Sequence, residues 1–120
     1  MSSPAHLVLR TVFGHDAFWA DQERIIDRAM SGQHSLVLMP TGMGKSLCYQ
    51  VPAIVMGREA GEEASRRSLT LVLSPLIALM KDQVDALVAR GVSATFINSS
   101  LDRQTRERRC TLSAHGLVFG

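Results

Sequence analysis

Residues 35–50 read SLVLMPTGMGKSLCYQ, and this stretch decides the fold. Its first five residues are a short apolar run that predicts a buried strand, residues 40–44 are turn material, and a helical stretch is expected from near Lys45. A glycine-containing loop between a buried strand and a helix N-terminus is the context that a phosphate-binding loop requires. The general pattern has a glycine where this chain has Met39, so an incidental Lys-Ser in an ordinary connection is the alternative interpretation.

The chemistry of such a loop follows from its backbone and two side chains. N–H groups of a tight glycine loop can point at phosphate oxygens, and the positive end of the next helix adds to that field. Lys45 is expected to act on the β- and γ-phosphates as the catalytic residue, and Ser46 to offer a hydroxyl oxygen to Mg²⁺. The candidate loop residues are Pro40, Thr41, Gly42, Met43, Gly44, Lys45 and Ser46.

Helical and strand patterns alternate along the rest of the chain. Strands that are apolar throughout and alternate with helices favour an α/β fold with a parallel sheet, helices on both faces and right-handed crossovers. Pro52 is expected to kink or restart the helix that begins near Lys45, which should end by Gly57. The other expected helices cover residues 3–14, 21–32, 74–91 and 101–114, with Ser3, Asp21 and Ser74 as caps, and the other expected strands cover 69–73, 92–97 and 117–119.

Composition sets the broad class. The chain has 120 residues, of which 46% are hydrophobic and 20% charged, which is the mix of one compact domain. A net charge of +2 argues against a protein that coats nucleic acid, so any DNA contact is expected to be local. Two cysteines and four histidines lack metal-site spacing. No leader or membrane-length apolar run is seen, so a cytoplasmic protein without a membrane partner is expected.

Several motifs together resemble one family. MPTGMGKSLCYQVPA at 39–53, LVLSPLIALMKDQVDAL at 71–87 and INSS at 97–100 resemble motifs of the RecQ-type DNA helicases of superfamily two, in the family's order. The resemblance implies a partial RecA-like P-loop domain that belongs to a 3′ to 5′ helicase coupling ATP hydrolysis to DNA unwinding in repair and recombination. It also implies ATP and Mg²⁺ as cofactors and single-stranded or partly duplex DNA as partner.

By the same resemblance, Gln22 would hydrogen-bond the adenine edge, with Phe13 and Phe18 forming the wall of that pocket. The family usually has Phe-Arg-Pro-Gly-Gln here, whereas residues 18–22 read FWADQ and lack both the arginine and the glycine. Trp19 could stack on a base through its ring face. The alternative is that Trp19 is a packed aromatic residue and Gln22 a polar helix residue.

Ser74-Pro75-Leu76 resembles the family's first DNA-contacting motif. A capped helix N-terminus offers N–H groups to a backbone phosphate without reading a base. The alternatives are that Ser74-Pro75 is an ordinary helix start, that Lys81 belongs to a solvated helix face and that Asn98 is a turn residue. Arg103, Arg106, Arg108 and Arg109 form a stripe that is interpreted as a solvated helix face, because acidic residues interrupt it. The candidate DNA-binding residues are Ser74, Pro75, Leu76, Lys81, Asn98 and Ser99.

An acidic strand end that would hold Mg²⁺ for hydrolysis is not found, nor is a second RecA-like lobe. We therefore expect residues 1–120 to be a single, incomplete RecA-like domain, with a helical segment carrying the adenine motif at 1–34, a P-loop βαβ core at 35–100 and an atypical tail at 101–120. Unwinding by this chain alone is not expected, and enzymatic activity and oligomeric state stay open. The alternatives are a non-catalytic ATP-binding or inert truncated stub and, remotely, an unrelated P-loop kinase.

Overall fold

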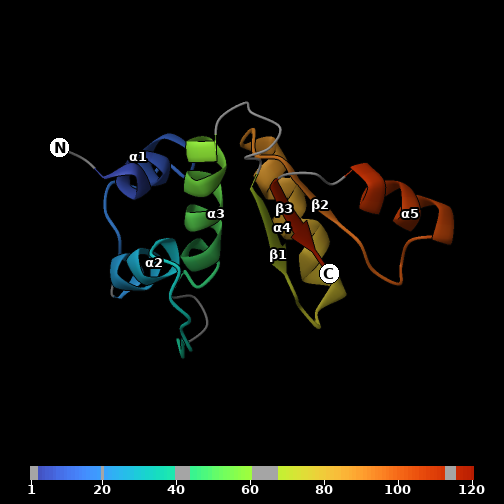
Figure 1. Cartoon of the computed structure of the whole chain (residues 1–120), viewed down its shortest axis with the longest axis horizontal. Coiled ribbons are helices and arrows are strands. Elements are labelled where there is room, and N and C mark those ends of the chain that lie inside the picture. Colours follow the sequence, from blue (N-terminus) through green and yellow to red (C-terminus); the bar gives the residue numbers. More distant parts are fainter. Residues whose placement is uncertain (1–2, 20, 40–43, 61–67, 113–115) are drawn as a thin grey trace. The chain divides into compact units, whose positions relative to one another are not determined.

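The computed structural model describes residues 3–19, 21–39, 44–60, 68–112 and 116–120. The chain divides into two compact units, Met1–Glu59 and Ala60–Gly120. Figure 1 labels the helices and strands of both units.

The described secondary structure of the first unit is helical. It comprises α1 (Pro4–Thr11), α2 (Gln22–Met30) and α3 (Leu47–Ala60), which reaches the unit boundary. Ser3 is the N-cap of α1, and its Oγ accepts a hydrogen bond from the backbone N–H of His6, which confirms the cap that the sequence predicts. All three helices contribute side chains that are at most 1% exposed, namely Val8, Leu9, Ile26 and Val51.

Helix α3 is longer than expected. It runs through Pro52 and past Gly57, so the predicted restart at the proline and the predicted end by the glycine are wrong. Pro52 removes one backbone donor and Gly57 costs about 1 kcal/mol relative to alanine. The burial of Val51, Ala53, Ile54 and Val55 on this helix offsets those costs.

Residues 35–39 do not form the predicted strand. The structure describes residues 33–39 without helix or strand, and Leu36 and Leu38 are 91% and 89% exposed. A strand needs a neighbour to bond its backbone N–H and C=O groups. The described part of the first unit is helical and offers no strand edge. The apolar pattern is therefore present without the partner that would make it a strand.

The second unit contains a parallel sheet. Its elements are β1 (Leu69–Val72), α4 (Ile77–Ala89), β2 (Ala94–Phe96), α5 (Arg103–Leu112) and β3 (Gly116–Phe119). The strand order is β1-β3-β2, and β3 pairs in parallel with both neighbours. Together with the flanking helices, this confirms the predicted partial α/β fold with its three strands near residues 69–73, 92–97 and 117–119.

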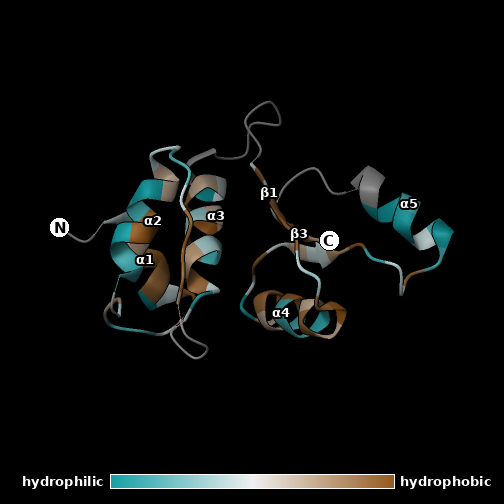
Figure 2. Ribbon diagram, turned by 90° about the horizontal axis from the view of Figure 1, so that it is seen from below, coloured by the Kyte–Doolittle hydropathy of each residue, from teal (hydrophilic) through white to brown (hydrophobic). Residues whose placement is uncertain are grey.

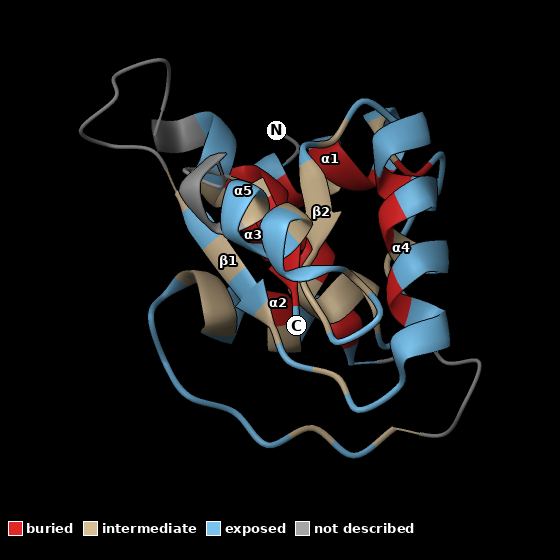
Figure 3. Cartoon of the chain, turned by 90° about the vertical axis from the view of Figure 1, so that its right-hand side faces the viewer, coloured by how far each residue is buried: buried red, intermediate tan, exposed pale blue. Residues whose placement is uncertain are grey.

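The central strand carries the core of the second unit. Leu117 and Phe119 are 2% and 1% exposed. α4 contacts β2 and buries Met80, Val84 and Leu87, which lie on one side of the helix while its other side is exposed (Figure 3). In Figure 2, β1 and β3 are coloured as hydrophobic and most of α5 as hydrophilic. The sheet is therefore built around the last strand in sequence.

Gly116 allows β3 to begin, and it provides a test of the fold. Its φ is +92°, and an added Cβ would collide with the backbone oxygen of Ser93. Gly116→Ala should lower the free energy of unfolding by more than about 1 kcal/mol, because alanine is strained at this φ and has no space. Gly57→Ala is the control, since a Cβ at that helical position meets nothing within 4 Å. It should raise the free energy of unfolding by about 0.5–1 kcal/mol. Equal effects in urea denaturation would contradict the described start of β3.

Candidate functional site

The end of the predicted phosphate loop leads directly into α3. Gly44 has a φ of +70° and its C=O accepts a hydrogen bond from the N–H of Leu47 at 3.2 Å. The carbonyls of Lys45 and Ser46 accept from the next residues of the helix in the same way. These three loop residues therefore lie at the N-terminal end of α3, where the helix dipole favours an anion. The other candidate loop residues, Pro40, Thr41, Gly42 and Met43, lie outside the described residues.

The structure joins the predicted adenine residue to this loop. Gln22 is the first residue of α2 and is 3% exposed. Its Oε1 accepts from the backbone N–H of Trp19 at 2.8 Å, and its Nε2 donates to the C=O of Gly44 at 3.2 Å. A Cβ on Gly44 would collide with this Nε2. The positive φ favours glycine at position 44, and an added Cβ there would displace the Gln22 amide from its present position.

A pocket lies beside Lys45 within the first unit. It has a volume of about 340 Å³, and its polar lining includes Lys45, Cys48 and Tyr49 from the loop and the start of α3. Burial raises the pKa of the Cys48 thiol, so the thiol stays protonated near neutral pH. The remaining lining residues are Ile25, Ala29, Gln33, Ser35 and Val37. The Lys45 side chain therefore borders a space that a small ligand could enter.

The aromatic residues of the adenine motif differ in their surroundings. Phe13 is buried, at 9% exposed. Phe18 meets the ring of His6 edge to face, with ring centroids 4.7 Å apart and planes at 64°. Trp19 is 58% exposed, which differs from the packed aromatic residue of the alternative interpretation. Asp21 is at the N-cap position of α2, as predicted, but makes no side-chain cap hydrogen bond; its carboxylate lies 3.8 Å from Arg24.

The first group of candidate DNA residues follows β1. Ser74 was expected to cap α4, but the N-cap is Leu76 and the helix begins at Ile77. The Oγ of Ser74 accepts from the N–H of Leu76, two residues on, which forms a turn rather than a cap. The Ser74 N–H donates to the C=O of Gly120 at 2.8 Å, so this turn lies at the end of β3. Pro75, between Ser74 and Leu76, is exposed.

The second group lies at the same edge of the sheet. Asn98 follows β2, and its Nδ2 donates to the Sδ of Met80 at 3.4 Å. Its Oδ1 accepts from the N–H of Ser100 at 2.9 Å, and the neighbouring Ser99 is exposed. Because β1 and β2 both pair in parallel with β3, the two groups lie at the same carboxyl edge of the sheet, and Asn98 contacts Met80, the neighbour of Lys81 in α4. The sequence predicted one group at a helix start and the other at the end of a strand, but it could not show that both lie at one edge of a sheet.

Two basic candidates are already paired. The Nζ of Lys81 lies 2.6 Å from Asp85, and the hydrogen bond and charge of that carboxylate raise the pKa of Lys81 above its ordinary value. Arg109 donates to the C=O of Phe96 at 2.7 Å and its guanidinium lies 4.6 Å from the Phe96 ring centroid. The Arg109 contacts attach α5 to β2, which supports a structural role for this arginine of the stripe.

Two further observations concern metal binding and membrane spans. The described residues hold no group of three or more histidine, cysteine, aspartate or glutamate side chains that could bind a metal ion. Among the helices in the described ranges, none is long and apolar enough to cross a membrane.

Comparisons with known proteins agree with these motifs. The DEAD/DEAH box helicase family model matches residues 19–118. The chain is 51% identical over 102 residues to the ATP-dependent DNA helicase RecQ of Haemophilus influenzae, covering 85% of this chain and 14% of that protein. It is 41% identical to the RecQ of Bacillus subtilis over 83% of the chain and 48% identical to the human ATP-dependent DNA helicase Q4 over 78% of it. The chain spans 15% and 7% of those two proteins.

The bond between Gln22 and Gly44 can be tested by changing one atom of the side chain. Gln22→Glu keeps an oxygen to accept from Trp19 but places a second oxygen against the C=O of Gly44. We expect the free energy of unfolding to fall by about 1–3 kcal/mol at pH 7, because a buried donor is replaced by a charged acceptor. Gln33→Glu, at an exposed position, should leave it within about 0.5 kcal/mol of the wild type. Equal losses from the two substitutions, measured by urea denaturation, would refute a special role for this bond.

Proposed function

Because the chain belongs to the DEAD/DEAH box helicase family, we propose that it is the ATP-binding part of a RecQ-like 3′ to 5′ DNA helicase that couples ATP hydrolysis to DNA unwinding in repair and recombination. The observation that carries the proposal is the hydrogen bond from Gln22 to Gly44, because it holds a base-binding candidate against the phosphate loop at the start of α3. The sequence identity supports the same assignment. The chain spans less than a fifth of the relatives named above, so the activity of a whole helicase is part of the proposal.

The triphosphate would bind at the N-terminal end of α3. Backbone N–H groups and the helix dipole favour the negative charge there, and Lys45 would place its ammonium group on the β- and γ-phosphates as the catalytic residue. Ser46 lies directly before the first residue of α3, and its hydroxyl oxygen is a ligand that suits Mg²⁺. Bound there with the nucleotide, Mg²⁺ would neutralise phosphate charge. Pro40, Thr41, Gly42 and Met43 complete the proposed loop.

The base would bind beside Gln22. A planar amide presents both a donor and an acceptor, which matches the adjacent donor and acceptor on the adenine edge. Gln22 already bonds to Trp19 and Gly44, so an incoming adenine would share or replace one of these bonds. Recognition of the base is thereby connected to the conformation of the phosphate loop. Phe13 and Phe18 are proposed as the aromatic wall.

Single-stranded DNA would bind at the carboxyl edge of the sheet in the second unit. In the turn at Ser74, Pro75 and Leu76 the Ser74 hydroxyl is a possible donor to a backbone phosphate, and the exposed Lys81 adds one cation. Asn98 and Ser99 adjoin them through the contact with Met80. Contacts of this kind position a strand without reading its sequence.

The proposal also covers the domain organisation of this chain. Residues 1–120 would form one incomplete RecA-like domain, with the adenine motif in 1–34, the P-loop core in 35–100 and an atypical tail in 101–120. Residues 1–120 would supply the ATP-binding function. A cytoplasmic location is part of the proposal.

The nucleotide site is tested by titrating a fluorescent ATP analogue with Mg²⁺. Lys45→Ala should weaken binding about tenfold or more, because it removes charge-assisted hydrogen bonds to phosphate. Lys81→Ala is a matched control, since the sequence holds two lysines and this one lies in α4. Equal affinities of wild type and Lys45→Ala would refute the site and leave the inert stub as the better description.

The DNA surface is tested by measuring binding to a labelled single-stranded oligonucleotide over a range of salt concentrations. Lys81→Ala should reduce the slope of log affinity against log salt by about 1, as expected for one lost phosphate contact. Lys81→Arg should retain the slope. Asp85→Ala should tighten binding, because it frees Lys81 from its present partner. An unchanged slope in Lys81→Ala would exclude this lysine from the interface.

A further inference from the structure

His6 connects three segments of the first unit. Its backbone N–H donates to Ser3 Oγ, and Ser3 Oγ lies 2.8 Å from His6 Nδ1, so the hydroxyl can donate its own proton to the ring. The same Nδ1 lies 4.0 Å from Oε1 of Glu23 in α2. The ring also meets Phe18 edge to face at 4.7 Å. Helix α1, the segment before α2, and α2 itself therefore converge on one partly buried side chain.

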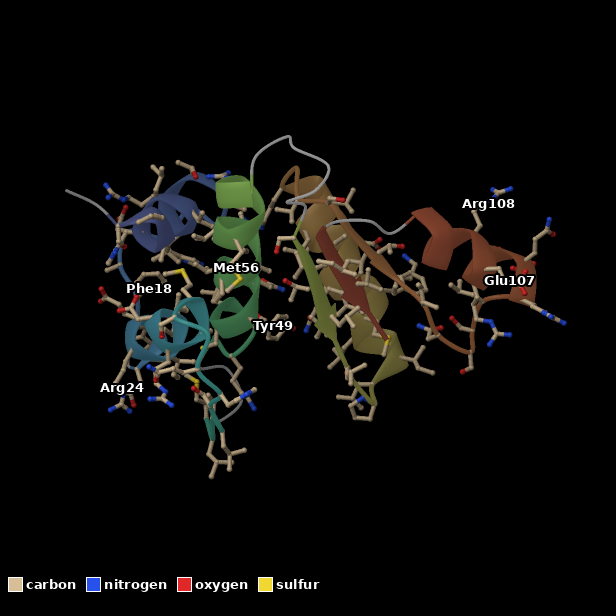
Figure 4. The ribbon with its side chains drawn as sticks, viewed as in Figure 1. Phe18, Arg24, Tyr49, Met56, Glu107 and Arg108 are labelled. Atoms are coloured by element: carbon tan, nitrogen blue, oxygen red, sulfur yellow. The ribbon has the colours of Figure 1, made fainter. Side chains whose placement is uncertain are left out.

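The contacts of His6 continue to the phosphate loop. Phe18 precedes Trp19, whose backbone N–H is held by Oε1 of Gln22, and Nε2 of Gln22 bonds to Gly44. Two contacts therefore hold this segment: the His6 ring packs against Phe18, and the Gln22 amide oxygen accepts from the Trp19 backbone N–H. Figure 4 shows the labelled Phe18 between α1 and α2. A displaced Phe18 would move the backbone that Gln22 holds.

We propose that His6 is a positioning residue for base recognition, which fixes Phe18 and, through it, the Trp19 backbone and the Gln22 amide. This inference rests on the proposed ATP-binding function and adds a residue that no motif identified. An edge-to-face pair has a preferred geometry, so the His6 ring favours one orientation of Phe18. The hydrogen bond between Ser3 and Nδ1 in turn restricts the His6 ring.

His6 should influence the base more than the phosphates. Its ring contacts lie on Phe18, Ser3 and Glu23, whereas Lys45 and Ser46 are carried by the loop that enters α3. Inorganic tripolyphosphate shares the phosphate chemistry of ATP and lacks its base. The two ligands therefore separate a base-positioning role from a general contribution to the fold.

The experiment measures the affinities of the full chain for ATP and for tripolyphosphate, each with Mg²⁺, by calorimetry. His6→Ala should weaken ATP binding by about threefold to tenfold, the range that an aromatic pair is worth, and leave tripolyphosphate binding unchanged. His6→Phe keeps a ring edge against Phe18 and should restore ATP affinity. His15→Ala removes another histidine, at an exposed position of the same unit, and should change neither affinity.

A second readout uses the sole tryptophan of the chain. Because Trp19 adjoins Phe18, saturating ATP should change its fluorescence emission in the wild type, and by less in His6→Ala. Unchanged ATP affinity in His6→Ala, an equal loss for both ligands, or an ATP affinity in His6→Phe as weak as in His6→Ala would each overturn the role of His6. Failure of the proposed function is seen separately, as tripolyphosphate binding that is equal in wild type and Lys45→Ala.

Discussion

The hydrogen bond between the Gln22 amide and the Gly44 carbonyl is the constraint on which the first unit's site depends. It joins residues 22 positions apart, and the Gln22 side chain that makes it belongs to a residue that is 3% exposed. A buried amide that bonds to the backbone on both sides costs free energy if either partner is lost. The proposed adenine motif and the end of the proposed phosphate loop are consequently linked in the fold, although they are two motifs in the sequence.

In the second unit, the strand order brings two candidate segments to the same part of the fold. Because β3 lies between β1 and β2, the turns that follow β1 and β2 are brought to one edge of the sheet. The contact between Asn98 and Met80 then joins the second turn to α4, the helix that follows the first turn. Loops at the carboxyl ends of parallel strands are where α/β proteins commonly place ligand contacts, and each of these loops carries short polar side chains.

Local patterns predicted most of the elements, and long-range partners account for the errors. The Ser3 cap and the three strands of the sheet were predictable, because they depend on nearby residues and on apolar runs. The strand at 35–39 was not formed, since pairing depends on a neighbour that no apolar pattern can specify. Helix α3 passed through Pro52 because burial outweighed propensity.

The candidate site followed the same rule. The loop pattern made Gly44 and Lys45 candidates and the family resemblance added Gln22, but the bond between Gln22 and Gly44 is a property of the folded chain. His6 carried no recognisable pattern, because a histidine in the first turn of a helix is unremarkable without knowledge of the ring that it meets. Side chains that act through a neighbour leave little trace in a single sequence.

The central place of β3 has a consequence for how the second unit is made. β1 and β2 are synthesised before residues 116–119, and these two strands do not pair with each other in the sheet. Until β3 is synthesised, β1 and β2 lack the strand that pairs with both of them, so their backbone groups have no partner in this sheet. Acquisition of the sheet is thus a late event in biogenesis, however early its first strand is synthesised.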